Sequence, residues 1–192
     1  QVNPKWNIPY GSLALINTAR GDTAGAVNIA NEGLKAIPDD VQLLQSLAVA
    51  YESGKDYPKA IATYERVLQQ KPDNAIAANN LASLLVDQRG DPESLKRAME
   101  LAAPFEKSGH PALVDTLGWA YYKSGENDKA LALLKKVVEK APKVPVFQYH
   151  LGMAYHKTGD IKSAKSYLAK AVETNADFPG ADEARQTLAS LR

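Results

Sequence analysis

A segment of about 34 residues recurs along this chain, and this recurrence limits the possible fold more than any other feature. The clearest copies read LLQSLAVAYESGKDYPKAIATYERVLQQKPDN, VDTLGWAYYKSGENDKALALLKKVVEKAPK and QYHLGMAYHKTGDIKSAKSYLAKAVETNAD, and a looser copy begins at Tyr10. Each copy reads as an apolar helix, a turn containing glycine and a second helix. One such helix pair cannot bury its own apolar stripe, so neighbouring pairs must stack. The predicted fold is therefore an all-α solenoid.

Glycine and proline mark the boundaries of the predicted helices. The turns within the pairs are expected at Gly21, Gly54, Gly125 and Gly159. The second helices are expected to stop before Pro38, Pro72 and Pro142, because proline cannot continue a helix. Another copy, residues 75–110, is two residues longer than the others, and we expect the excess in the turn around Gly90 and Asp91.

The recurring residues resemble those of tetratricopeptide repeats, which are helix pairs with Leu, a small residue and Tyr in the first helix. Those positions hold Leu47, Ala48 and Tyr51; Leu117, Gly118 and Tyr121; and Leu151, Gly152 and Tyr155. The small residue of the second helix is Ala26, Ala60, Ala98, Ala130 and Ala164. The early Trp of the family is absent, and its positions hold Tyr10, Leu44, Ala78, Val114 and Gln148.

This resemblance implies a right-handed α-solenoid of five helix-turn-helix repeats in residues 7–178. We place the repeats at 7–40, 41–74, 75–110, 111–144 and 145–178, after an N-terminal tail of residues 1–6. Residues 179–192 read as a capping helix, in which Leu188 and Leu191 could cover the last pair. Trp6 precedes the first repeat and Ile8 lies at its start, without an evident cap. We therefore expect an open N-terminal end, which further repeats or a second copy could cover.

Composition and motifs argue against several classes of function. The formal net charge is +1, which gives no strong attraction to nucleic acid. The chain has no Cys, and no apolar run approaches the ~20 residues of a membrane span, so we expect no membrane insertion in this segment. His150 and His156 are too far apart on one helix to form a metal pair, and no catalytic motif occurs. We expect a non-catalytic protein without metal or cofactor.

A second stripe of side chains, rotated away from the core stripe, runs along the first helices of the last three repeats. The resemblance implies that this stripe faces the concave groove of the solenoid, where a peptide or protein segment would bind. The candidate residues are Asn79, Asn80 and Ser83; Asp115, Trp119 and Tyr122; and Tyr149, Met153 and His156. Aromatic side chains are enriched in binding hot spots, and Asn can both donate to and accept from a peptide backbone.

Alternatives remain for these residues and for the function. Trp119 could instead pack against the neighbouring first helix, and Asn79 and Asn80 could be solvated. The leading hypothesis is a protein-interaction scaffold that holds a segment in its groove. The second is a structural subunit of a bacterial envelope complex that associates with itself through the open N-terminal end. NNLASLL followed by DTLGWAYY resembles repeats of envelope and exopolysaccharide-export proteins, which suggests a periplasmic or envelope location.

Overall fold

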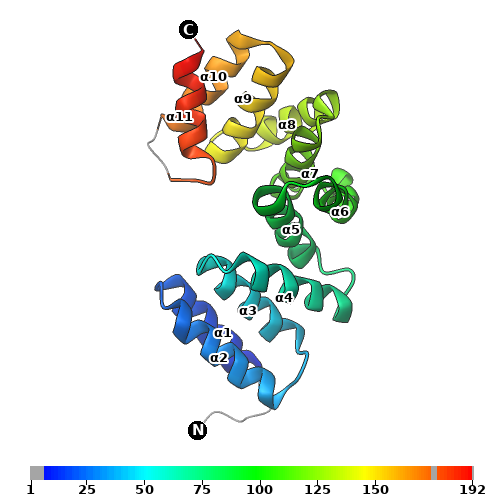
Figure 1. The fold of residues 1–192 in the computed structure, drawn as a ribbon, viewed down its shortest axis with the longest axis vertical. Helices are drawn as coiled ribbons and strands as arrows, with labels where there is room; N and C mark the ends of the chain where they lie inside the picture. The colour runs from blue at the N-terminus through cyan, green and yellow to red at the C-terminus, as the bar shows by residue number, and fades with distance from the viewer. Residues whose placement is uncertain (1–6, 174–176, 192) are drawn as a thin grey trace. The chain divides into compact units, whose positions relative to one another are not determined.

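The structure, a computed structural model, describes residues 7–173 and 177–191 and is built from pairs of helices (Figure 1). The helices are α1 (Asn7–Ala19), α2 (Thr23–Ala36), α3 (Val41–Ser53), α4 (Tyr57–Gln70), α5 (Ala75–Leu84), α6 (Pro92–Ala102), α7 (Pro111–Ser124), α8 (Asn127–Lys140), α9 (Pro145–Thr158), α10 (Ile161–Val172) and α11 (Ala181–Ser190). Strands are absent from the described residues, and the all-α prediction is confirmed.

The chain divides into two compact units, of which the first ends at Gln88 and the second begins at Arg89. In the first unit α3 packs on both α1 and α2, α4 packs on α3, and α5 packs on α4. Ala14, Ala30 and Leu47 form a core cluster there, one residue from each of α1, α2 and α3. Stacking of successive pairs therefore buries the apolar stripe that a single pair would leave exposed.

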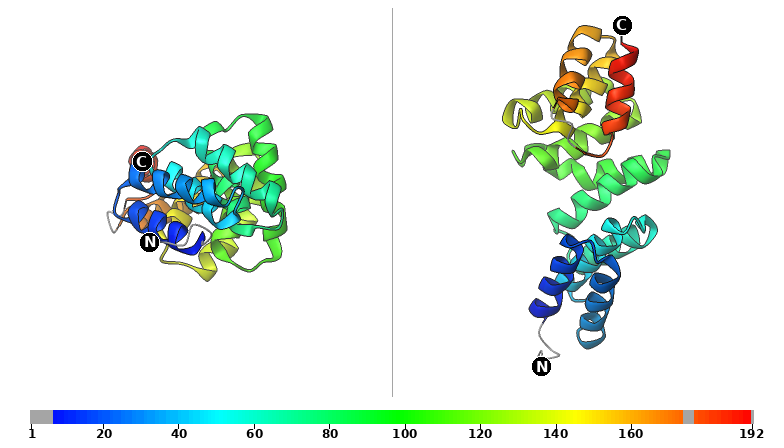
Figure 2. Two further views of the ribbon diagram at one scale, coloured as in Figure 1. Left: turned by 90° about the horizontal axis from the view of Figure 1, so that it is seen from below. Right: turned by 90° about the vertical axis from the view of Figure 1, so that its left-hand side faces the viewer.

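In the second unit α6 packs on α7, α8 packs on both α7 and α9, and α10 packs on α9. Helix α11 packs on α10 and α9, so it covers the last pair, and the right view of Figure 2 shows it beside α10. Gly118 and Gly152 face the second helix of their own pair. A Cβ at these positions would lie 2.9 Å from Leu134 and 2.8 Å from Leu168, respectively, so a small residue is required for the helices to approach this closely.

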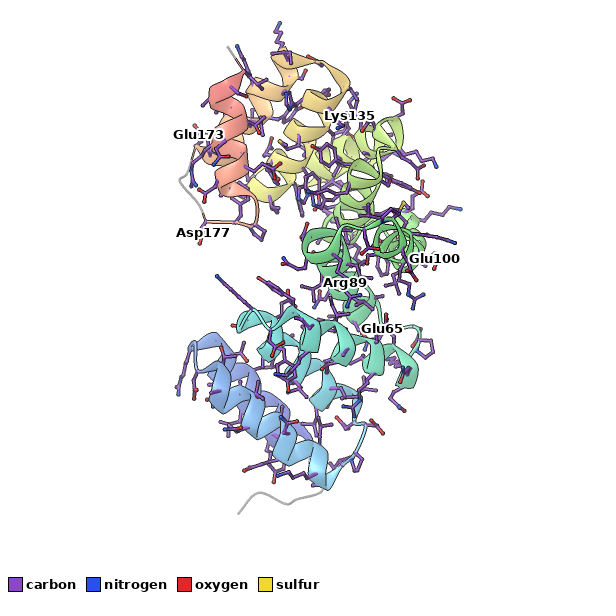
Figure 3. The ribbon with its side chains drawn as sticks, in the orientation of Figure 1. Glu65, Arg89, Glu100, Lys135, Glu173 and Asp177 are labelled. Atoms are coloured by element: carbon purple, nitrogen blue, oxygen red, sulfur yellow. The ribbon has the colours of Figure 1, made fainter. Side chains whose placement is uncertain are left out.

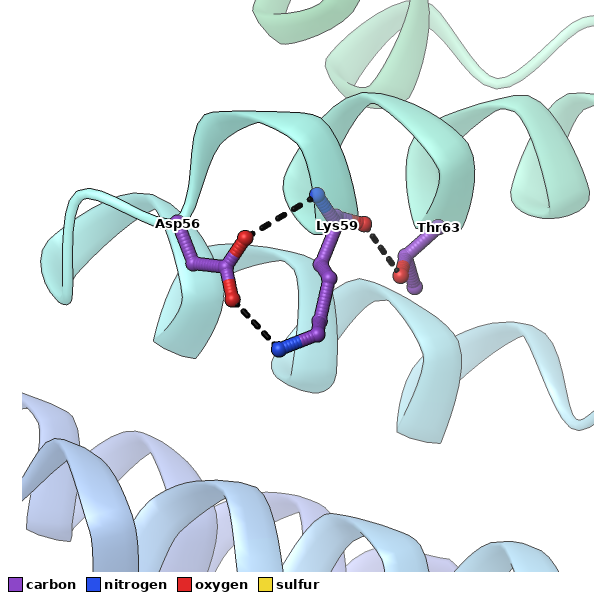
Figure 4. A network of polar contacts seen from close by, with 3 residues as sticks. All are labelled: Asp56, Lys59 and Thr63. Atoms are coloured by element: carbon purple, nitrogen blue, oxygen red, sulfur yellow. Dashed lines mark hydrogen bonds and ion pairs between the residues drawn. The ribbon is translucent and has the colours of Figure 1, made fainter.

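Carboxylate and amide side chains begin most of the helices. Asp56 is an example: its carboxylate accepts hydrogen bonds from the backbone N–H of Lys59 at 3.3 Å and from Lys59 Nζ at 2.6 Å (Figure 4). Thr63 then donates to the Lys59 carbonyl at 2.7 Å. The hydrogen bond from the Lys59 side chain is the main reason that the pKa of Asp56 is lowered. The same N-cap bond is made by Asp22, Asp40, Asn74, Asp91 and Asp160.

The helix ends follow the predicted punctuation, with one difference in the turns. Pro38, Pro72 and Pro142 each come two residues after the end of α2, α4 and α8. Gly54 has a φ of −80°, whereas the neighbouring Lys55 has a φ of 60°. Gly54 is needed for space instead, because a Cβ there would lie 2.6 Å from the Thr23 methyl group.

In the longest repeat, residues 75–110, part of the two-residue excess lies before the turn in which the sequence predicts it. Residues Leu85–Arg89 continue α5 as a π-helix, and Gly90 follows with a φ of 65°. A π-helical turn takes up more residues than an α-helical one, so part of the excess lies inside the helix. The division between the two units also falls within this repeat, with α5 in the first unit and α6 in the second.

Candidate protein-binding surfaces

The second unit contains six of the candidate binding residues, and the structure buries four of them. Trp119 is 5% exposed and Tyr149 is 2% exposed, and Asp115 and Met153 are also buried. Tyr122 is half-buried and His156 is exposed. The sequence leaves open whether Trp119 packs against the neighbouring first helix or faces the groove. In the structure it is buried and packs within the chain. Direct access from solvent is therefore limited to Tyr122 and His156 among these six side chains.

An aromatic stack holds Trp119 in place between α7 and α9. Its ring lies 4.6 Å from that of Tyr122, with the planes 8° apart, and 4.0 Å from that of His150, with the planes 15° apart. Tyr149 meets it in a tilted arrangement at 5.4 Å. Stacked and tilted ring pairs each add stability beyond their buried area. Tyr122 is the most exposed of these rings, and it packs on the rigid group that Trp119 and the other rings form.

A buried polar contact accompanies this stack. His150 Nδ1 lies 2.8 Å from Asp115 Oδ2, and the side chains of both residues are about nine-tenths buried. An ionised carboxylate can only accept, so with Asp115 ionised Nδ1 is the donor in this hydrogen bond. Asp115 and His150 come from α7 and α9, and their contact fixes the register of the two first helices.

Helix α11 and the segment before it cover Tyr149. The Tyr149 hydroxyl donates to Glu183 Oε2 at 2.6 Å, and the ring of Phe178 lies 5.8 Å away in a tilted arrangement. Gly180 lies against the same ring, since a Cβ on Gly180 would be only 2.3 Å from Tyr149 Cε1. The capping helix therefore buries one candidate groove residue.

Tyr122 lies in an environment that is partly apolar and partly acidic. Burial, and secondarily the negative charge of Glu183, raise the pKa of its hydroxyl. The Lys123 ammonium group lies 4.8 Å from the centre of the Trp119 ring, in cation–π distance. The half-buried Tyr122 ring thus lies near one acidic side chain, Glu183, and a basic side chain, Lys123, lies over the Trp119 ring on which Tyr122 stacks.

In the first unit a chain of hydrogen bonds involves Asn80. Asn80 Nδ2 donates to the Tyr64 hydroxyl at 2.9 Å, and Tyr64 donates to Glu52 Oε2 at 2.9 Å. Burial raises the pKa of Glu52, and the hydrogen bond from Tyr64 partly opposes this effect. The amide group of Asn80 thus links α5 to α4 and α3, so part of its hydrogen-bonding capacity is used within the unit.

The other two candidates of the first unit, Asn79 and Ser83, are half-buried on α5. Ser83 Oγ lies 3.5 Å from Asp87, a long hydrogen bond. The side-chain oxygen of Asn79 is buried, and none of the described residues donates a hydrogen bond to it. Buried polar atoms are normally paired, so this oxygen is an exception among the described residues.

Sequence reasoning places Glu52 on the stripe of the second repeat, but it does not identify His150, Tyr64 or Glu183 as members of these clusters. The sequence offers His150 only as a possible metal ligand. The available signal is a polar residue on a first helix next to the stripe, 35 residues after Asp115. Glu183 could not be paired with Tyr149 from the sequence, because the contact depends on how α11 packs.

The described residues also show whether metal sites and membrane-spanning helices are present, and where the exposed charges lie. Within residues 7–173 and 177–191, no group of three or more His, Asp or Glu side chains is arranged to hold a metal ion. None of the helices in these ranges has the length and apolarity that crossing a membrane requires. Exposed charges such as Glu100 and Lys135 lie on the second helices α6 and α8 (Figure 3).

Comparison with known proteins gives matches along most of the chain. The tetratricopeptide repeat family matches residues 17–85 and 121–191. The TPR repeat-containing protein PA4667 of Pseudomonas aeruginosa is 31% identical over 111 residues, which are 58% of this chain and 19% of that protein. Cellulose synthase operon protein C of Pseudomonas fluorescens is 26% identical over 126 residues, 65% of this chain and 10% of that protein. The chain thus spans only a small part of either relative's length.

Solved structures with the same fold match almost the whole chain. TTC0263, a thermophilic TPR protein of Thermus thermophilus, is 23% identical with a TM-score of 0.71, and the match covers 96% of this chain and 97% of that one. YrrB, described as a TPR protein with an unusual peptide-binding site, is 20% identical with a TM-score of 0.69, covering 96% and 94%. The matched residues, the helix pairs and the small residues between them lead to one conclusion: this chain belongs to the tetratricopeptide repeat family.

Proposed function

We propose that this chain is a protein-interaction scaffold that binds an extended segment of a partner protein along its first helices. The family and the fold support an interaction scaffold in general. The observation that carries the finer proposal is the side-chain oxygen of Asn79, a buried acceptor to which no described residue donates. The Asn79 residue is half-buried, so a rotation of its amide group would bring this oxygen to the surface, where a backbone N–H of a bound segment would supply the missing hydrogen bond.

The second unit would contribute a different kind of contact. Tyr122 is held against Trp119 before any partner arrives, so little side-chain entropy is lost when a partner packs on it. His156 occupies the equivalent position in the next repeat, 34 residues later, and is exposed. Trp119, Tyr149, Met153 and Asp115 would act indirectly, because they fix the positions of the helices and rings that a partner meets.

The peptide-binding role has a precedent within the fold. YrrB, which shares the fold at 20% identity, is described as having a peptide-binding site. The likeness to cellulose synthase operon protein C makes an envelope partner the first to test. Chemistry is not part of the proposal, in which a preorganised surface selects a partner by hydrogen bonds and ring contacts.

Affinity capture from the organism that encodes the chain tests the proposal. Soluble and detergent-solubilised envelope fractions would be offered separately to the wild type and to Asn79→Ala, Tyr122→Ala and His156→Ala variants. Substitution of a binding hot spot costs about 2 kcal/mol or more, so we expect captured partner to fall by about 30-fold for at least one variant.

Matched controls lie on the same or neighbouring helices. Ile76→Ala changes an exposed residue of α5 one turn before Asn79, and Lys136→Ala changes an exposed residue of α8. Both controls should capture partner as the wild type does. Equal capture by the wild type and by all three groove variants would refute the proposed binding surface.

A further inference from the structure

Two tyrosine rings and two lysine side chains form a contiguous cluster across three helices of the second unit. The rings of Tyr155 on α9 and Tyr167 on α10 lie 5.5 Å apart, with their planes 11° apart. Lys135 Nζ of α8 lies 5.3 Å from the centre of the Tyr155 ring, and Lys170 Nζ of α10 lies 5.0 Å from the centre of the Tyr167 ring. Both tyrosines are half-buried and both lysines are exposed. We call these four residues the lysine–tyrosine cluster.

The corresponding lysines of two earlier repeats are neutralised within the chain. Lys59 Nζ lies 5.4 Å from the centre of the Tyr51 ring and also pairs with Asp56 at 2.6 Å. Lys129 Nζ lies 5.2 Å from the centre of the Tyr121 ring and forms an ion pair with an acidic residue in the same way. In both repeats the lysine comes eight residues after the tyrosine, from the second helix of the same pair.

The last repeat departs from this pattern. Ser163 stands eight residues after Tyr155, and Asp160 accepts hydrogen bonds from the Ser163 backbone N–H at 3.0 Å and from the Ser163 hydroxyl at 2.7 Å. Tyr155 is contacted instead by Lys135, which comes from the preceding helix pair. Among the residues that the structure describes, neither Lys135 nor Lys170 forms an ion pair with an acidic side chain. The two ammonium groups can therefore receive an anion from outside the chain.

The helices around the cluster carry an excess of positive charge. Residues 127–172 hold nine Lys against three Asp or Glu, a formal charge of +6, whereas the whole chain has +1. Helix α10 has three Lys and no acidic residue. Glu139, one turn after Lys135, and Glu173, one turn after Lys170, are the nearest acidic residues along the chain. These two carboxylates reduce the attraction for an anion but do not reverse its sign.

We propose that the lysine–tyrosine cluster is a docking site for an acidic segment of a partner protein, and this site does not depend on the first-helix surface proposed above. An ammonium group has three N–H donors, so Lys135 and Lys170 can each bind a carboxylate on the side away from the ring. Contact with a ring already restricts each lysine side chain, so less conformational entropy is lost when a carboxylate binds. Two ammonium groups over two different rings fit a segment with several Asp or Glu better than a single carboxylate. A protein is the kind of partner that the family match supports.

Fluorescence anisotropy with a labelled peptide of ten glutamates tests this docking site on the whole chain. Exposed ion pairs are weak, so the protein would be titrated from about 1 μM to about 1 mM. At a salt concentration of about 0.1 M, the Debye length of about 10 Å screens distant charges. We expect the wild type to bind this peptide and not a labelled peptide of ten glutamines. The Lys135→Ala/Lys170→Ala variant should bind the glutamate peptide about tenfold more weakly.

The Lys71→Ala/Lys136→Ala variant is the matched control, because it removes the same charge from two exposed lysines outside the cluster. Lys136 follows Lys135 directly but points about 100° away from it around α8. This control should bind the glutamate peptide within about twofold of the wild type. All four lysines are exposed, so circular dichroism melts of both variants should match that of the wild type.

Three results would overturn the proposal. The first is a wild type that does not bind the glutamate peptide, and the second is an equal loss of binding in the two variants. The third is tighter binding of the wild type to a single-stranded DNA of ten thymidines than to the glutamate peptide, which would assign the cluster to nucleic acid.

Discussion

The hydrogen bond between Asp115 and His150 should be one of the strongest single contacts in the second unit. We consider the change His150→Phe, which removes the donor but keeps an aromatic ring next to Trp119. Because the ring distance to Trp119 is 4.0 Å, a Phe ring of similar size can retain the stack. The substitution therefore isolates the hydrogen bond to the carboxylate from the aromatic contact.

The magnitude follows from burial and from the charge on the acceptor. The side chains of His150 and Asp115 are 10% and 8% exposed, so water weakens this contact far less than it weakens an ion pair on the surface. Hydrogen bonds to charged groups contribute about 1.5–3 kcal/mol. We expect His150→Phe to lower the free energy of unfolding by about 2–3 kcal/mol. In a double-mutant cycle with Asp115→Ala, the coupling energy between the two residues should be about 1.5–3 kcal/mol.

Urea unfolding followed by tryptophan fluorescence measures these energies. The chain has two Trp, so a Trp6→Phe background leaves Trp119 as the single reporter of the second unit. The four proteins of the cycle would be compared at neutral pH in this background. Additive effects, with a coupling energy below about 0.5 kcal/mol, would refute the reasoning that this contact joins α7 to α9.

Three further predictions concern single residues. Because burial raises the pKa of Glu52 above its ordinary 4.5, the folded state keeps this proton at higher pH than the unfolded state does. The stability that this group contributes is present below about pH 4.5 and is lost as the pH rises through the folded pKa. In urea unfolding, the free energy of unfolding of the Glu52→Gln variant should therefore rise relative to that of the wild type from acidic to neutral pH. Parallel pH profiles of the two proteins would contradict this. Gly180→Ala places a Cβ 2.3 Å from the Tyr149 ring at a backbone position with a φ of 91°. This substitution should destabilise the packing of α11 by about 1–3 kcal/mol and speed amide hydrogen exchange in α11. An unchanged exchange rate would argue against the close contact. Lys55→Gly should raise stability by up to about 1 kcal/mol, because Lys55 has a φ of 60°, and a lower melting temperature would count against strain at this turn.

The repeat was readable from the sequence because its signals are local. Leucine and small residues recur at fixed positions, glycines mark turns, and Pro38, Pro72 and Pro142 follow helix ends. Neighbouring pairs then repeat the same contact, so one correct pair predicts the others. The π-helix at Leu85–Arg89 was missed because an extra residue can enter either a helix or a turn, and the choice depends on packing.

The candidate site was less predictable, because helical spacing gives the direction of a side chain and not what covers it. Trp119 and Tyr149 lie on the stripe that the pattern assigned to the groove. Tyr149 is nevertheless buried, because Phe178, Gly180 and Glu183 fold onto it from a distant part of the sequence. The bond between Asp115 and His150 likewise joins two repeats and has no local signal.

Photo-crosslinking tests the central claim, that partners bind along the first helices, most directly. A benzophenone amino acid would be introduced at His156, which is exposed on α9, and separately at Lys136, which is exposed on α8. After irradiation in cells of the encoding organism, we predict a crosslinked partner from position 156 and none from position 136. A partner crosslinked from position 136 alone would contradict the account and move the binding surface to the second helices.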